Sequence, residues 1–202
     1  LPDQVPDVVT PAGPGRSTMV LVHGGFWRPE YDRLHLRPLA DALVQEGYLV
    51  VSLEYRRIPG APDASVDDVR LALRRLAAGD VPTHLPPARH LIGHSAGGHL
   101  ALLMAGDPGT GLASCLALAP VADLRGADRA RLDDDAVFAF LGAEPSGRSD
   151  LDPARFPPPS IPVTVLLGEN DAIVPAFVSI VDEWRSQGTT RFVTIPGAGH
   201  FS

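Results

Sequence analysis

The chain has 202 residues, of which 45% are hydrophobic, and a formal net charge of −7 at neutral pH. This is enough apolar content for one compact domain with a core, and the length is too short for two domains, so we treat residues 1–202 as a single domain. The negative charge and the pI near 5.4 argue against a nucleic-acid or anionic-membrane partner, because such surfaces bind clustered positive charge.

All 17 basic residues are arginine, so the chain has no lysine. This excludes a phosphate-binding Walker lysine, a Schiff-base lysine and a Ser-Lys dyad. Cys115 is the single cysteine and cannot form an internal disulfide. No apolar run reaches the roughly 18 residues of a membrane span, and no charged-then-apolar leader opens the sequence. We therefore expect a cytoplasmic protein with a small-molecule partner, and the sequence leaves its oligomeric state open.

Short apolar runs alternate with helical periodicity along most of the chain, which is typical of a parallel sheet built from βα units. The first 16 residues are rich in proline and glycine and are expected to form an extended lead-in. The apolar runs after them are mostly unalternating, as expected of strands covered on both faces. Strands are predicted at residues 18–22, 48–53, 89–92, 114–119, 163–167 and 191–195.

Helices are predicted between these strands, on both faces of the sheet. Apolar residues recur at helical spacing from Leu36 to Val44 and stop at Gly47, a residue type that commonly follows a helix. Further helices are expected around residues 66–76, from Ser95 to about Ala105, and from Ala176 to about Ser186.

The segment at about residues 123–159 differs from the rest because it is charged and rich in turn-forming residues. It has one helix-like patch at Ala136 to Leu141 and a second possible turn near Asp150 to Arg155. We interpret it as a short insertion over the carboxyl edge of the sheet, where open α/β sheets bind their ligands.

Residues 93–97, with the sequence GHSAG, fit the pattern G-x-S-x-G between a predicted strand and a predicted helix. This is the context that a nucleophile elbow requires. The glycines leave room for a strained serine backbone, and the helix N-terminus favours a developing negative charge. The same pentapeptide also occurs by chance in ordinary glycine-rich turns. In this context it predicts Ser95 as a nucleophile.

Residues 23–27, with the sequence HGGFW, follow another predicted strand and offer a flexible glycine backbone. We expect the backbone N–H groups of Gly25, Phe26 and Ala96 to form an oxyanion hole. The alternative is a simple turn with two aromatic residues in the core, which leaves the glycines unexplained. We assign Trp27 to substrate binding, with core packing as the alternative.

A serine nucleophile needs a base, and the base needs an acid that holds it in one tautomer. Asp171 and His200 each lie in a loop after a predicted strand, in the order Ser, acid, His, and so at the same sheet edge as Ser95. Glu169 and Asp123 are the competing acids. The sequence predicts a triad of Ser95, Asp171 and His200.

The remaining histidines do not have the spacing of a metal site. His94 and His99 are five residues apart, which is not the i, i+4 spacing of a helical zinc site. His35, His84 and His90 lack partners at ligand spacing. We expect no metal and no organic cofactor.

Together these motifs resemble the α/β-hydrolase superfamily, and within it the esterase and kynurenine-formamidase-like branch that carries HGGxW, here His23 to Trp27. The resemblance extends to GHSAGGHL at residues 93–100, EYRR at 54–57 and PGAGH at 196–200. It spans about Ser17 to His200 and implies the α/β-hydrolase fold.

The substrate is less specified than the fold. Relatives of this kind cleave short-chain esters, aryl formamides or, in the prolyl-oligopeptidase-like enzymes, peptide bonds. We therefore expect a serine hydrolase that cleaves a small ester or aryl formamide, with a peptidase or a non-catalytic binding module as alternatives. The chain departs from these relatives in two features, because they usually carry extra strands before the HGG strand and a helix after the histidine.

Overall fold

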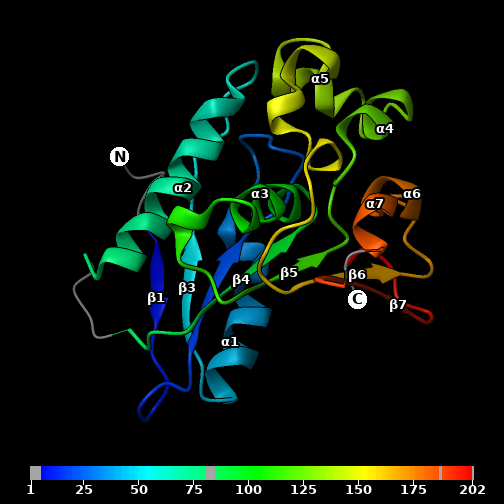
Figure 1. The fold of residues 1–202 in the computed structure, drawn as a ribbon. Coiled ribbons are helices and arrows are strands. Elements are labelled where there is room, and N and C mark those ends of the chain that lie inside the picture. The colour runs from blue at the N-terminus through cyan, green and yellow to red at the C-terminus, as the bar shows by residue number, and fades with distance from the viewer. Residues whose placement is uncertain (1–5, 81–84, 187, 202) are drawn as a thin grey trace.

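A seven-stranded, mostly parallel sheet forms the centre of the protein in a computed structural model that describes residues 6–80, 85–186 and 188–201 (Figure 1). The strand order is β1-β3-β2-β4-β5-β6-β7, and only β1 runs antiparallel to its neighbour. The strands are β1 (Asp7–Val9), β2 (Thr18–Val22), β3 (Leu49–Leu53), β4 (Arg89–His94), β5 (Ser114–Leu118), β6 (Val163–Gly168) and β7 (Thr190–Ile195). This architecture confirms the predicted α/β fold class.

The order of the strands reverses at β2. From β2 the chain moves to β3 on one side, and it then crosses back past β2 to β4 on the other side. Connections between parallel strands are almost always right-handed, so opposite directions of travel place the connecting helices on opposite faces. Accordingly, α1 (Arg37–Gln45) and α2 (Pro62–Ala78) lie on opposite sides of the sheet in Figure 1. The carboxyl ends of β2 and β4 flank this reversal, which is where open α/β sheets bind ligands.

After β4 the chain continues in one direction, so the later helices share the face of α2. These are α3 (Ala96–Ala105), α6 (Ala176–Ser179) and α7 (Asp182–Arg185). Strands β5 and β6 consequently alternate between buried and half-buried residues, with Leu116 and Leu166 on the less covered side. The expectation of strands covered on both faces, which concerns most of the apolar runs, does not hold for these two strands.

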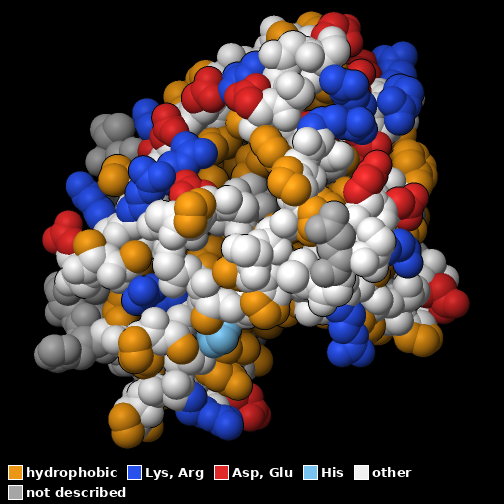
Figure 2. Space-filling view, in the orientation of Figure 1, with side chains coloured by type: hydrophobic (Ala, Val, Ile, Leu, Met, Phe, Trp, Pro, Cys, Tyr) orange, Lys and Arg blue, Asp and Glu red, His pale blue; other side chains and the backbone are white. Residues whose placement is uncertain are grey.

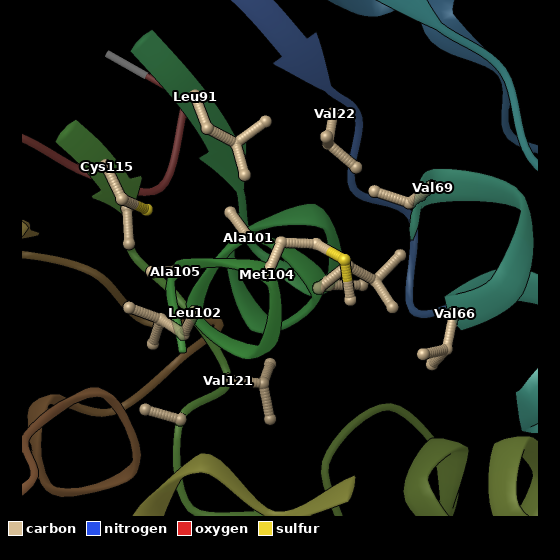
Figure 3. Close-up of a cluster of buried hydrophobic side chains, with 14 of the residues drawn as sticks. Val22, Val66, Val69, Leu91, Ala101, Leu102, Met104, Ala105, Cys115 and Val121 are labelled. Carbon is tan, nitrogen blue, oxygen red and sulfur yellow. The ribbon is translucent and has the colours of Figure 1, made fainter. Parts of the chain in front are cut away.

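The main core lies between the sheet and α3. Almost every residue of α3 is buried, as expected of a helix that is apolar on all sides. Figure 3 shows Ala101 and Met104 of α3 packed between Leu91 of β4 and Val69 of α2. Cys115 lies in this cluster, where burial raises the pKa of its thiol to about 12. It is therefore a core residue.

The boundaries differ from the sequence predictions in two places. The lead-in contains β1, which pairs with β3 through Val8 and Val51. The helix predicted from Ala176 to about Ser186 is instead two short helices, because the Val178 carbonyl accepts the N–H groups of Ala122 and Asp123 and cannot bond to the next turn. The described residues also form the 3-10 helices η2 (Arg33–Leu36), η3 (Pro108–Thr110), η4 (Pro145–Leu151) and η5 (Pro153–Arg155).

The insertion consists of α4 (Leu124–Arg129), α5 (Ala136–Leu141), η4 and η5. Sequence analysis found α5 and the turn near residues 150–155 but missed α4. Two buried hydrogen bonds fix the insertion: His99 Nε2 donates to the Leu151 carbonyl at 2.7 Å, and Leu124 N donates to Asp152 at 3.0 Å. The insertion is therefore attached to α3, the helix that begins at the elbow.

Acidic and basic side chains are interspersed on the face shown in Figure 2, with hydrophobic side chains between them. Many of the charges are paired; Arg148, for example, contacts both Asp63 and Asp150. Within the described ranges, no helix is long and apolar enough to cross a membrane.

Candidate active site

Ser95 occupies a strained turn between β4 and α3. Its backbone has φ 56° and ψ −117°, a conformation that costs energy for a residue with a Cβ atom and that is commonly found at functional sites. The Ser95 N–H donates to the Leu118 carbonyl at 2.8 Å, which ties the turn to β5. The residue is 2% exposed.

Two glycines allow the segments around Ser95 to approach closely. A Cβ atom on Gly97 would lie 2.2 Å from the Val22 carbonyl oxygen, and one on Gly24 would lie 2.9 Å from Ser95 Cβ. Real Cβ atoms do not make such short contacts, so both positions require glycine. The loop after β2 is therefore pressed directly against Ser95.

His200 and Asp171 form a buried pair. His200 Nδ1 lies 2.7 Å from Asp171 Oδ2, and the two side chains are 3% and 5% exposed. The other carboxylate oxygen accepts the N–H groups of Ile173 and Val174, each at 2.9 Å. Burial acts to raise the pKa of Asp171, but the hydrogen bonds from His200 and the two backbone N–H groups outweigh it and lower the pKa. Asp171 is therefore ionised and holds the Nδ1–H tautomer of His200.

The two competing acids bind elsewhere. Glu169 accepts the N–H of Gly197 at 2.9 Å, at the start of the loop that carries His200. Asp123 accepts the N–H of Gly126 and caps α4. Neither carboxylate contacts the imidazole in the described structure, whereas Asp171 does.

His94 connects the elbow to the loop of His200. Its Nε2 donates to the His200 carbonyl at 2.9 Å, and the two rings lie 4.7 Å apart. Burial lowers the pKa of His94 to about 4, so the ring is neutral at pH 7. The described residues contain no hydrogen bond between Ser95 Oγ and His200 Nε2, and such bonds are often long before a substrate binds.

Three described peptide groups near Ser95 share one pattern. The carbonyl oxygen of each accepts a hydrogen bond, and no acceptor for its N–H lies among the described residues. Within the described part of the chain, the N–H groups of Gly25, Phe26 and Ala96 have no acceptor. In a trans peptide the carbonyl points away from the following N–H, so fixing the carbonyl fixes the direction of the N–H. The three carbonyls accept from His23 Nδ1 (Gly24 O, 2.8 Å), Arg28 N (Gly25 O, 2.9 Å) and His99 N (Ser95 O, 3.1 Å).

Trp27 belongs to the core. Its ring stacks on Phe140 of the insertion at 4.4 Å, meets the edge of His99 at 5.2 Å, and is 3% exposed. Core packing, the second of the two alternatives for this residue, describes its position. The next residue, Arg28, pairs with Asp133, so the loop after β2 is joined to the insertion at two points.

Sequence reasoning missed the polar cluster under this loop. Glu54, at the end of β3, accepts from His23, Arg33 and Arg57. The available signal was a charged run, EYRR, directly after a buried strand.

The other histidines make ordinary contacts. His35 Nδ1 donates to the Asp32 carbonyl, and His90 bonds to Ser114. His84 lies outside the described residues. Among the residues that the structure describes, no three His, Cys, Asp or Glu side chains are grouped so that they could hold a metal ion.

The same fold occurs in solved esterase structures. Esterase B from Lactobacillus rhamnosis, in a structure with a tributyrin phosphonate, is 20% identical with a TM-score of 0.80, covering 98% of this chain and 73% of that chain. Esterase 2 from Thermogutta terrifontis, phosphonylated by sarin, is 21% identical with a TM-score of 0.76, covering 96% and 79%. These likenesses show the α/β-hydrolase fold.

None of the curated proteins matches the chain. The BD-FAE family model matches residues 7–112, which is just over half of the chain and contains the HGGFW loop, the EYRR run and the GHSAG elbow. The chain therefore belongs to the BD-FAE family.

Proposed function

We propose that this protein is a serine hydrolase that cleaves small carboxylic esters, or aryl formamides, through an acyl-enzyme. The observation that carries the proposal is the buried Asp171–His200 pair beside the strained turn of Ser95. An ionised acid, a histidine whose Nε2 has no partner among the described residues and a serine on a sharp turn are the parts that nucleophilic acyl transfer needs.

In the proposed mechanism Ser95 Oγ attacks the carbonyl carbon of the substrate while His200 Nε2 takes its proton. The carbonyl oxygen becomes an oxyanion, which accepts hydrogen bonds from the N–H groups of Gly25, Phe26 and Ala96. His200 then gives the proton to the leaving group, and Asp171 stabilises the imidazolium in between. Water then attacks the acyl-enzyme while His200 takes its proton. His200 gives this proton to Ser95 Oγ as the bond between Ser95 and the acid product breaks.

The fixed insertion favours a small acyl group. Trp27 stacks on Phe140 and Arg28 pairs with Asp133, so the insertion is joined to the loop of the proposed oxyanion hole. The two helices of the insertion have six residues each, too few to enclose a long acyl tunnel. Structures of esterase 2 from Thermogutta terrifontis contain propionate or butyrate, which are short acids.

A series of aryl esters tests the proposal. Formyl, acetyl and butyryl esters should exceed long-chain esters in kcat/KM, because each methylene contributes about 1 to 3 kcal/mol only while space remains. The series is measured beside N-formylkynurenine and a prolyl peptide, with Ser95→Ala as the background.

The outcomes separate the alternatives. Activity that rises steadily to long-chain esters contradicts the small pocket, and dominance of the formamide selects the formamidase-like branch. Cleavage of the peptide alone selects a peptidase.

A further inference from the structure

Glu54 is a buried carboxylate that is held by many donors. Its side chain is 4% exposed. Oε1 accepts from His23 Nε2 at 2.8 Å, from Tyr55 N at 3.2 Å and from Arg57 Nη1, and Oε2 accepts from the backbone and side chain of Arg33, each at 3.2 Å. Burial acts to raise the pKa of Glu54, but the bond and charge of His23, the Arg33 N–H and the charge of Arg57 lower it to about 2. Glu54 is therefore ionised at neutral pH.

His23 lies between two acceptors. Its Nε2 faces Glu54 Oε1 at 2.8 Å, and its Nδ1 faces the Gly24 carbonyl oxygen, also at 2.8 Å. A carbonyl oxygen can only accept a hydrogen bond, so the Nδ1 that faces Gly24 carries a proton and donates it. Arg57 Nη1 lies 3.2 Å from Nε2, but its two protons already go to Glu54 and the Tyr55 carbonyl.

The ring has almost no freedom to turn. It is fully buried and stacks on the Tyr55 ring at a centroid distance of 4.4 Å. Turning the ring would break its hydrogen bond to Glu54 and move Nδ1 away from the Gly24 carbonyl oxygen. Glu54 thus fixes which ring atom faces Gly24.

The Gly24 carbonyl belongs to the peptide that contains the N–H of Gly25. Gly24 is followed by Gly25 at φ 101°, and two glycines in succession put few steric restraints of their own on the peptide between them. Bonding to the carbonyl holds the plane of the peptide, and the Gly25 N–H then points the opposite way. A donor on the carbonyl also polarises the peptide and strengthens its N–H as a donor.

We infer that His23, held by Glu54, is a positioning residue that aims the Gly25 N–H at the developing oxyanion. This inference rests on the proposed function, because it assigns a role within the same site. His23 does not touch the reacting atoms and acts through one peptide. Its contribution should therefore appear in the transition state and not in substrate binding.

The decisive comparison uses three variants and a short-chain aryl ester. His23→Leu removes the donor to Gly24, and His23→Asn keeps an N–H close to the position of Nδ1. We expect kcat to fall about 100-fold in His23→Leu with KM within about threefold of wild type, since a lost oxyanion donor costs about that much in turnover. The kcat of His23→Asn should exceed that of His23→Leu by at least about tenfold. The Ki of a trifluoromethyl ketone should rise in parallel with the fall in kcat/KM.

Tyr55→Phe is the matched control. It removes a buried bond of the same length, but to the His23 carbonyl, whose peptide N–H on Gly24 goes to His35. This variant should lose stability and keep kcat within about threefold of wild type. Equal losses in Tyr55→Phe and His23→Leu would overturn the inference, as would a folded His23→Leu with normal kcat or with a change in KM alone.

A measurement on the wild-type protein decides the question if His23→Leu does not fold. Nitrogen-15 NMR of the His23 ring should show a proton on Nδ1, and an unprotonated Nδ1 would overturn the inference. Failure of the proposed function is distinguishable, because it would appear as wild-type protein that hydrolyses none of the substrates.

Discussion

Three acidic side chains lie in the loops that follow β5 and β6, and they differ in what each carboxylate binds. Asp171 bonds to the imidazole, Glu169 to the Gly197 N–H, and Asp123 to the start of α4. Asp171→Asn should therefore keep the fold and reduce kcat by about 10⁴-fold, because an amide favours the wrong tautomer of His200. Steady-state kinetics on a short-chain aryl ester, with circular dichroism as the check on folding, measures this.

Glu169→Gln and Asp123→Asn are the controls, because each removes one negative charge near the same sheet edge. Both should stay within about tenfold of wild type. A severe loss in either of them, with Asp171→Asn near normal, would assign the acid to a different residue.

The proposed triad could be selected from the sequence because each member lies in a short motif at the end of an apolar run. The network of Glu54 and His23 could not, because these residues are 31 positions apart and meet only when β2 and β3 pair in register. Trp27 shows the same limit: aromatic character alone does not say whether a ring faces a pocket or, as here, stacks on Phe140.

Among the secondary-structure elements, α3 is joined to the insertion by the hydrogen bond of His99, and we expect this connection to depend on pH. Burial lowers its pKa from 6.5 to about 4, although its bond to Leu151 acts in the opposite direction. Its Nδ1 has no partner among the described residues, so protonation would leave a charge in the core without an acceptor. The unfolded chain takes up this proton near pH 6.5, before the folded protein does. The contribution of neutral His99 to the free energy of unfolding is therefore fully present above pH 6.5 and is lost as the pH falls toward 4.

His99→Gln keeps a donor near Nε2 and removes the titrating group. Between pH 7 and pH 4 the wild type should lose roughly 3 kcal/mol more of its unfolding free energy than this variant, as the shift in pKa implies. Urea unfolding of both proteins at both pH values measures this. The other titrating groups contribute equally to the wild type and the variant, so their effect cancels when the two losses are subtracted. Parallel losses in the two proteins would show that His99 does not carry this dependence.

The sequence predicted six strands and the helices α1, α2, α3 and α5 closely because their apolar runs are long or strongly periodic. It missed β1, which has three exposed residues and is defined only by pairing with β3. The break between α6 and α7 was missed for a related reason. Val178 is apolar and in helical register, but its carbonyl is taken by the backbone after β5.

At the scale of the whole molecule, one reversal of strand order determines both the position of the site and the distribution of the helices. It brings the loops after β2 and β4 together, which places Gly24 against Ser95. Among the α-helices that the structure describes between strands, it also places α1 on one face of the sheet and α2, α3, α6 and α7 on the other (Figure 1). Right-handed crossovers explain this asymmetry without reference to individual side chains.

Covalent labelling with a fluorophosphonate tests the central claim, that Ser95 is an activated nucleophile. Trypsin can cut only after arginine in this chain, so the peptide of residues 90–125 contains both Ser95 and Ser114, and fragmentation is needed to locate the adduct. We expect one adduct per wild-type chain, located on Ser95, and none in Ser95→Ala. A well-folded wild-type protein without an adduct, or an adduct that persists in Ser95→Ala, would contradict it.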